Sequence, residues 1–318
     1  MNLQTTVHIP KAERLITYND HILLLGSCFA DEMAAKMREC YMQVISNPFG
    51  TLYNPLSIVQ ALRMTDVPTL LNYNGLWHSM AHHGEFSYPS EQQTRTAVRK
   101  SIDSMQNALH NANVIVVTFG TAWVYEMPEM NDNQLPFGSI VANCHKMPSD
   151  RFRRRRLTVD EIVEAWMPVL TAMPDKHWIF TVSPIRHLKD GLHENQLSKA
   201  TLLMAVEQLT AHCGTAEYFP AYEILQDELR DYRFYADDLV HPSSLAVEYI
   251  WEQWVKSHTS SQMQEEMRTL HRLWLDSHHH TLHPDSAEAV EFDKRTAQKR
   301  KELAQHYPWI ATREQSCN

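Results

Sequence analysis

The stretch His21-Ile22-Leu23-Leu24-Leu25-Gly26-Ser27-Cys28-Phe29-Ala30 decides the fold of this chain. Its apolar run Ile22–Leu25 predicts a buried strand, and the residues after Gly26 have helical character. Glycine permits a tight turn between the two, so we expect Ser27 at the carboxyl end of the strand, where open α/β sheets bind ligands. Serine is also a preferred helix N-cap, and this segment alone favours a capping role over a catalytic one.

The same alternation of strand and helix continues through most of the chain. Short apolar runs predict further strands at Tyr41–Ile45, Val114–Phe119, Trp178–Val182 and Glu217–Phe219. Apolar residues spaced three and four apart predict amphipathic helices at Cys28–Glu39, Arg95–Asn111, Val159–Leu170 and Gln196–His212. We therefore expect a three-layer α/β domain built on a five-stranded parallel sheet.

The last part of the chain has a different pattern. Beyond about Lys256 the strand signals stop, and the polar segments Gln262–Leu275 and Ala287–Gln305 have helical spacing. The expected organisation is one α/β domain over residues 1–255 and a C-terminal helical extension over residues 256–318.

Two segments, Asn72–Ser90 and Asn131–Asp150, show no periodicity. We expect both to be long loops, which often carry function in compact domains. His83, beside His82 in the first of them, is a candidate to close over a substrate pocket.

Composition limits the classes of function. The 318 residues carry a formal net charge of −9, which disfavours a nucleic-acid partner. No apolar run resembles a signal peptide or reaches the length of a membrane span. The five cysteines are an odd number without a CxxC pair, which is typical of free thiols in a reducing compartment. The interpretation is a soluble cytoplasmic protein, with no cofactor expected.

A second motif stands near the end of the α/β part, in Tyr235-Ala236-Asp237-Asp238-Leu239-Val240-His241-Pro242-Ser243-Ser244. Asp238 and His241 are three residues apart, before an expected helix from Leu245 to Val255, so the carboxylate can orient the imidazole. Asp, Pro and Ser also favour turns, and a lone DxxH is a weak signal. Together with Ser27 after the first strand, the motif predicts a Ser-His-Asp triad.

Several motifs resemble the GSCFA family, named after a run that stands here as Gly26-Ser27-Cys28-Phe29-Ala30. The others are Asn47–Pro55, Phe119–Tyr125, Asn143–Lys146, Ser183–His187 and Asp238–Ser243. The resemblance implies a relative of the SGNH/GDSL hydrolases, which are esterases, lipases and carbohydrate deacylases with a flavodoxin-like sheet. It implies Ser27 as nucleophile, His241 as general base and Asp238 as the acid that orients it.

The resemblance also implies donors for an oxyanion hole. The backbone amide of Ser27 is one, and Gly50, which closely follows the second strand, is the best match for another. SGNH enzymes usually have an asparagine two residues after a glycine at the end of the third strand, whereas here Ala122 follows Gly120. The remaining candidates for the missing donor are Asn47, Gly120, Thr121, Trp123 and Asn143.

Other residues are candidates for contact with substrate. Trp123, His145 and His187 follow segments expected at the active edge of the sheet, although a structural role is as good an interpretation for each histidine. The tail histidines His278–His280 and His283 lack the spacing and nearby carboxylate of a metal site, so no metal is expected.

Two further features have competing interpretations. Cys28 lies at an expected helix start, where a thiolate is stabilised, but a buried structural cysteine is the better interpretation. Arg153-Arg154-Arg155-Arg156 can hold an anionic substrate group, but charge runs are usually solvated faces.

The sequence thus predicts a serine acyl-ester hydrolase or acyltransferase that acts on a small-molecule or carbohydrate ester. The alternative is a catalytically weak protein of the same fold that binds a carbohydrate or acylated ligand. The acyl group, its alcohol carrier and the oligomeric state stay open.

Overall fold

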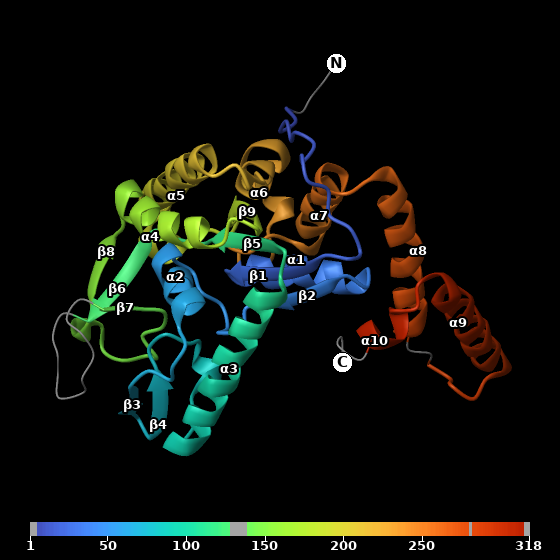
Figure 1. Cartoon of the computed structure of the whole chain (residues 1–318), viewed down its shortest axis with the longest axis horizontal. Helices are drawn as coiled ribbons and strands as arrows, with labels where there is room; N and C mark the ends of the chain where they lie inside the picture. Colours follow the sequence, from blue (N-terminus) through green and yellow to red (C-terminus); the bar gives the residue numbers. More distant parts are fainter. Residues whose placement is uncertain (1–4, 128–138, 280–281, 315–318) are drawn as a thin grey trace.

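The structure is a computed structural model, and it describes residues 5–127, 139–279 and 282–314. At its centre is a five-stranded parallel sheet in the order β10-β9-β5-β1-β2 (Figure 1). Numbered along the chain, its strands lie in the order 2-1-3-4-5, which is the flavodoxin-like arrangement. The strands are β1 His21–Gly26, β2 Gln43–Ser46, β5 Val114–Phe119, β9 His177–Val182 and β10 Ala216–Tyr218.

Alternate residues of the central strands enter two different cores. Leu23 and Leu25 of β1 face one hydrophobic cluster, whereas Ile22 and Leu24 face the other. Four helices cover the first face: α2 Pro55–Arg63, α3 Glu91–Asn111, α4 Val159–Ala172 and α5 Leu192–His212. Two long helices cover the second: α1 Cys28–Glu39 and α7 Ser244–His258. The domain therefore has the three layers that the sequence predicts.

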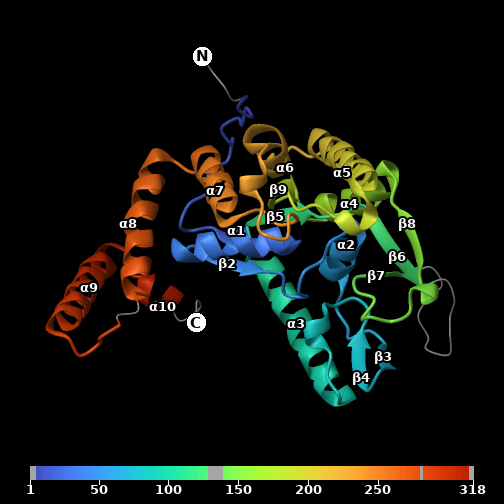
Figure 2. The same ribbon diagram turned by 180° about the vertical axis from the view of Figure 1, so that it is seen from behind.

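Two small antiparallel sheets lie at one side of the central sheet (Figures 1 and 2). The first is a hairpin of β3 Leu70–Tyr73 and β4 Leu76–Ser79. It contacts α3 toward the end of that helix that lies away from the central sheet. The second has the order β7-β6-β8 and is made of β6 Trp123–Met127, β7 Ser139–Val141 and β8 Arg153–Arg156.

The C-terminal helices lie on the opposite side of the molecule (Figure 1). They are α8 Ser261–Ser277, α9 Ala287–His306 and α10 Ile310–Glu314. Met263, Met267 and Leu270 of α8 are buried in the same cluster as residues of α1 and α7. The start of the extension thus packs onto the α/β domain, and the boundary at residues 255/256 stays a prediction.

Short helical turns complete the described residues. They are α6 Ala221–Glu223, the π-helix η4 Ile224–Leu229, and the 3-10 turns η1 Gly84–Phe86, η2 Ser149–Arg151, η3 Leu188–Asp190 and η5 Tyr232–Phe234. None of the described helices is long and apolar enough to cross a membrane.

All five predicted strands are confirmed, with ends that differ by at most two residues. The predicted long loop Asn72–Ser90 is wrong over β4, which pairs with β3 through the Asn74-Gly75 turn. In the second predicted loop, residues 139–141 form β7, and residues 131–138 lie outside the described part of the chain. The arginine run is a strand, β8, and α2 was not predicted.

Candidate active site

The turn between β1 and α1 requires a glycine. Gly26 has φ +131°, and a Cβ atom there would lie 2.0 Å from the carbonyl oxygen of Thr118 on β5. The backbone amide of Gly26 also donates to Asn47 Oδ1 at 2.8 Å. This close approach of β1 and β5 places Ser27 where the strand order reverses, which is the usual ligand site of such sheets.

Ser27 occupies the N-cap position of α1, but its side chain makes no capping hydrogen bond. Its hydroxyl instead donates to Ser183 Oγ at 3.1 Å, and the residue is 1% exposed. Ser183 directly follows β9 and also accepts a hydrogen bond from the Ile185 amide at 3.3 Å. The hydroxyl of Ser27 is therefore directed across the ends of the strands and not into the helix.

The buried side chain of Lys199 bonds to the backbone just after β5 and just after β9. Lys199 of α5 donates through Nζ to the carbonyl oxygens of Gly120 and Ser183, both at 2.7 Å. Burial lowers the pKa of Lys199 to about 7. A neutral amine has two N–H donors, which matches the two carbonyl acceptors.

Asp238 and His241 form a direct pair on the loop before α7. His241 Nδ1 lies 2.6 Å from Asp238 Oδ2, while Asp238 Oδ1 accepts from the amides of Val240 and His241 at 2.9 and 3.0 Å. These hydrogen bonds, led by those from His241, lower the pKa of Asp238 to about 2. The segment is thus both a turn, which was the competing interpretation, and an oriented Asp-His pair.

The loop after β9 holds the Asp-His loop in place. The Arg186 amide donates to the Val240 carbonyl at 3.2 Å, and the Arg186 guanidinium donates to the Leu239 carbonyl at 2.5 Å. Leu239 has a φ of 58°, a left-handed conformation that this bonding supports. The sequence did not assign a role to Arg186, although it lies in the Ser183–His187 motif.

A pocket of about 450 Å³ lies at this edge of the sheet. Its wall includes Cys28 at the start of α1, His241, the loop after β9, and residues of β6 and β8. Ser27 does not itself line the pocket, and its hydrogen bond is to Ser183. Of the three predicted triad residues, His241 lines the pocket, Asp238 is bonded to His241, and Ser27 is buried next to Cys28 of the pocket wall.

Most candidate oxyanion donors already have acceptors in the chain. The Gly50 amide donates to Asn47 O at 2.7 Å, and the Gly120 amide donates to Tyr53 O at 2.9 Å. The Asn47 side chain accepts from Gly26 and donates to Asp31 Oδ2, and Asn143 Oδ1 accepts from the His145 amide. The Ser27 amide has a longer bond, 3.4 Å to Thr118 O.

Three pocket residues, Trp123, Arg186 and His187, have a buried side-chain nitrogen without a hydrogen-bond partner among the described residues. Trp123 Nε1 and His187 Nε2 are both buried and unbonded. Burial, followed by the nearby charge of Lys199, lowers the pKa of His187 to about 4, so this imidazole is neutral at neutral pH. Tyr53, whose ring meets that of His187 edge-on at 6.3 Å, also lines the pocket and was not singled out by the sequence.

The other candidate histidines lie outside the wall of this pocket. His145 Nε2 lies 2.9 Å from the Ser79 carbonyl oxygen, and burial lowers its pKa to about 4. His83 lies against Gly50, and its Nδ1 lies 3.3 Å from Glu85 Oε1. His82 is buried and stacked on Phe49. Substrate contact by His83 and His145 therefore stays a prediction.

Cys28 lines the pocket, but burial raises the pKa of its thiol. Burial raises this pKa by more than the backbone amides at the start of α1 lower it, so the thiol stays protonated at neutral pH. Across the ranges that the structure describes, no group of three His, Cys, Asp or Glu side chains could hold a metal ion.

The sheet order and the site together define an α/β protein of the flavodoxin-like class, with polar residues gathered at the switch point. Residues 21–254 match the GSCFA family, and the chain belongs to that family. No curated protein gives a significant match.

Proposed function

We propose that this protein is a serine acyl-ester hydrolase related to the SGNH enzymes, with Ser27, His241 and Asp238 as its triad. The observation that carries the proposal is the 2.6 Å pair between His241 and Asp238. His241 is part of the pocket wall, and so is Cys28, the neighbour of Ser27. An orienting carboxylate on Nδ1 leaves Nε2 of the imidazole to act as a base.

The reaction follows from these roles. His241 Nε2 removes the hydroxyl proton as Ser27 Oγ attacks the ester carbonyl carbon, and Asp238 stabilises the imidazolium. The imidazolium then returns the proton to the leaving alcohol, which gives an acyl-enzyme. Water, activated by the same imidazole, releases the carboxylic acid and restores the serine. An alcohol in place of water makes the reaction a transfer.

Attack requires the Ser27 hydroxyl to exchange its acceptor from Ser183 to His241. Rotation about χ1 is the simplest route, because Ser27 has no capping bond to lose. A neutral hydroxyl-hydroxyl bond contributes only about 1 kcal/mol net, so its loss is a small part of an activation barrier.

The oxyanion donors we propose are the Ser27 amide and Trp123 Nε1. The amide has only a long internal bond, and the indole N–H is buried in the pocket region without an acceptor among the described residues. In this proposal Trp123 Nε1 serves in place of the asparagine that SGNH enzymes usually have at the position of Ala122. The loss of one oxyanion donor typically costs about 3–4 kcal/mol of transition-state stabilisation.

Hydrolysis of 4-nitrophenyl acetate by purified variants tests the proposal. Ser27→Ala and His241→Gln should each lower kcat by about 10³-fold or more, to the background rate. Asp238→Asn should lose much of the rate, whereas Asp237→Asn, a matched change at the neighbouring aspartate, should retain it. Ser90→Ala, at the N-cap of α3, controls for the loss of a serine at a helix start. Equal rates for wild type and Ser27→Ala would refute the hydrolase.

The second candidate is a binding protein for a carbohydrate or acylated ligand. It is favoured by the burial of Ser27 and by the internal bonds of the Gly50 and Gly120 amides. In that case no ester is hydrolysed above background, while ligands still bind to Ser27→Ala with wild-type affinity.

A further inference from the structure

The side chain of Ser27 is enclosed by the segments that follow β5 and β9. A Cβ atom on Gly120, just after β5, would lie 3.5 Å from Ser27 Cβ. On the other side, Ser27 Oγ donates to Oγ of Ser183, just after β9, at 3.1 Å. Ser27 is 1% exposed and Ser183 is 0% exposed, and neither lines the pocket. The hydroxyl of Ser27 is therefore held inside the chain and is not presented in the pocket.

The backbone of Ser183 is fixed without help from its side chain. Its amide donates to the Phe119 carbonyl oxygen at 2.8 Å, and its carbonyl oxygen accepts from Lys199 Nζ at 2.7 Å. The same amine holds the Gly120 carbonyl oxygen at 2.7 Å. The two segments beside Ser27 are thus tied to one buried group. A change of the Ser183 side chain should leave both segments in place.

The Ser183 hydroxyl serves as a hydrogen-bond acceptor. Its oxygen accepts from the Ser27 hydroxyl at 3.1 Å and from the Ile185 amide at 3.3 Å. A serine oxygen has two lone pairs, so these two bonds use both of them. A nucleophilic serine is activated by a general base, and a second serine hydroxyl is not one. The bond to Ser183 therefore orients the Ser27 hydroxyl without activating it.

The base that we propose lies elsewhere, in the pocket wall. His241 lines the pocket, and its Nδ1 is bonded to Asp238 at 2.6 Å. A serine hydroxyl has one proton to donate, so a bond from Ser27 to Ser183 and a bond from Ser27 to His241 exclude each other. Ser27 also makes no capping bond to the helix α1. Its orientation is therefore set by Ser183.

We propose that Ser183 is a positioning residue, which holds the Ser27 hydroxyl away from His241 in the resting protein and so restrains the nucleophile. This role rests on the proposed hydrolase function, in which Ser27 attacks. Release of Ser27 needs only a rotation about χ1, because the backbone bonds of Ser183 do not involve Ser27. Only the fraction of molecules with a released Ser27 reacts, so the observed rate is reduced by that fraction.

The rate of fluorophosphonate labelling of Ser27 tests this role. Ser183→Ala removes the acceptor, and we expect its labelling to be about fivefold faster than that of wild type, which corresponds to about 1 kcal/mol. Damage to the fold would slow the reaction, so an increase is specific to release. The pH profile of labelling should keep its midpoint, because His241 is still the base. A shifted midpoint would contradict a role that acts through the position of Ser27 alone.

Thr181→Val is the matched control. Thr181 is on the same strand, two residues before Ser183, and its hydroxyl is buried without a hydrogen-bond partner among the described residues. Loss of that hydroxyl should leave the labelling rate within about twofold, well below the fivefold effect. Ser183→Thr keeps the acceptor and should restore the slow rate of wild type.

Ser183→Cys is a second variant, for use if Ser183→Ala does not fold. Its side chain is close to serine in shape, but sulfur is a weak acceptor, so labelling should again be faster than in wild type. The proposal is overturned if the folded variant without the Ser183 oxygen is labelled no faster than wild type. It is also overturned if Thr181→Val accelerates labelling to the same extent.

Crystal structures of wild type and Ser183→Ala separate this inference from the proposed function. We expect χ1 of Ser27 to differ by about 120° between the two, with Oγ turned toward His241 in the variant. An unchanged χ1 would contradict the role of Ser183 even if the protein hydrolyses esters. A changed χ1, with neither labelling nor ester hydrolysis in any variant, would support the hold of Ser183 on Ser27 and contradict the hydrolase.

Discussion

At the scale of single residues, Lys199 is the most unusual ionisable group beside the site. It is buried under the ends of β5 and β9 and holds the carbonyls of Gly120 and Ser183. Its lowered pKa of about 7 means that the unfolded chain binds more protons than the folded one between about pH 7 and the ordinary lysine pKa of about 10.4.

Stability should therefore rise with pH in this window because of Lys199. The gain has an upper limit of about 1.4 kcal/mol per pH unit. Urea unfolding at several values from about pH 7 to 9 should show wild type gaining stability relative to Lys199→Met. Parallel pH dependences for the two proteins would contradict the assignment of the shift to Lys199.

The sequence located the candidate triad residues because each lies in a short, recognisable motif. It could not show that Ser27 is bonded to Ser183, a contact across 156 residues that only the parallel pairing of β1, β5 and β9 creates. Nor could it show that Trp123 Nε1 lacks an acceptor, because burial and partners depend on the packing of the whole pocket. The catalytic roles themselves stay predictions.

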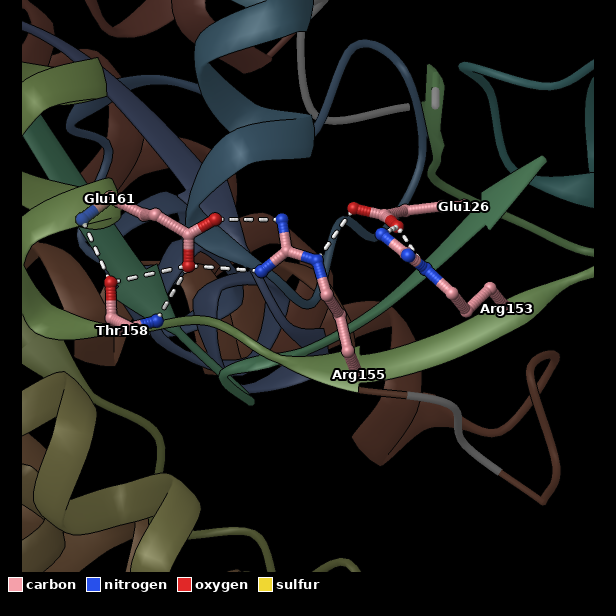
Figure 3. A network of polar contacts seen from close by, with 5 residues as sticks. All are labelled: Glu126, Arg153, Arg155, Thr158 and Glu161. Atoms are coloured by element: carbon pink, nitrogen blue, oxygen red, sulfur yellow. Dashed lines mark hydrogen bonds and ion pairs between the residues drawn. The ribbon is translucent and has the colours of Figure 1, made fainter. Parts of the chain in front are cut away.

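At the scale of elements, the strand β8 is stabilised by the carboxylate of Glu126, which pairs with Arg153 and Arg155 (Figure 3). Burial would raise the pKa of Glu126, but hydrogen bonds from Arg155 and Arg153 outweigh it, and the net pKa is lowered. A lowered carboxyl pKa adds stability above the ordinary glutamate pKa of about 4.3, and this stability is lost as pH falls through the folded-state pKa.

Glu126→Gln should thus be less stable than wild type at neutral pH, and the difference in Tm should shrink as pH falls below about 4. Scanning calorimetry across this range measures the difference. Glu164→Gln, on the exposed side of α4, should match wild type at every pH. A difference between wild type and Glu126→Gln that does not change with pH would rule out the ionised carboxylate as its source.

Strands that contain a short apolar run were predictable, including the partly exposed β2 and β10, whereas the arginine strand β8 was not. β5 is buried at every residue and reads as a continuous apolar run. β8 consists of arginines whose alternation between two faces has no hydrophobic signature. The β3–β4 hairpin did leave a signal, since Asn74-Gly75 is a favoured two-residue turn and both residues have positive φ.

At the scale of the whole molecule, the C-terminal helices are attached to the α/β domain by an arginine clamp. Arg313 of α10 is 9% exposed and donates to the carbonyl oxygens of Tyr41 and Tyr18 at 2.9 and 2.7 Å. Its guanidinium also lies 3.9 Å from the centre of the Trp309 ring. The end of the described chain is thus fixed against the turn before β2.

Arg313→Ala should lower the free energy of unfolding by about 2 kcal/mol, because two buried carbonyls lose charged donors. Arg272→Ala, on the exposed side of α8, is the control and should change stability by less than about 0.5 kcal/mol. Equal urea midpoints for Arg313→Ala and wild type would contradict a role of the clamp in stability.

The central claim is that Ser27 is an activated nucleophile, and covalent labelling tests it most directly. The protein is treated with a fluorophosphonate, and the modified residue is located by peptide mass mapping. We predict one adduct, on Ser27, that is absent from Ser27→Ala and strongly slowed in His241→Gln. Absence of an adduct in folded wild type, or an adduct at another residue that persists in Ser27→Ala, would contradict the account.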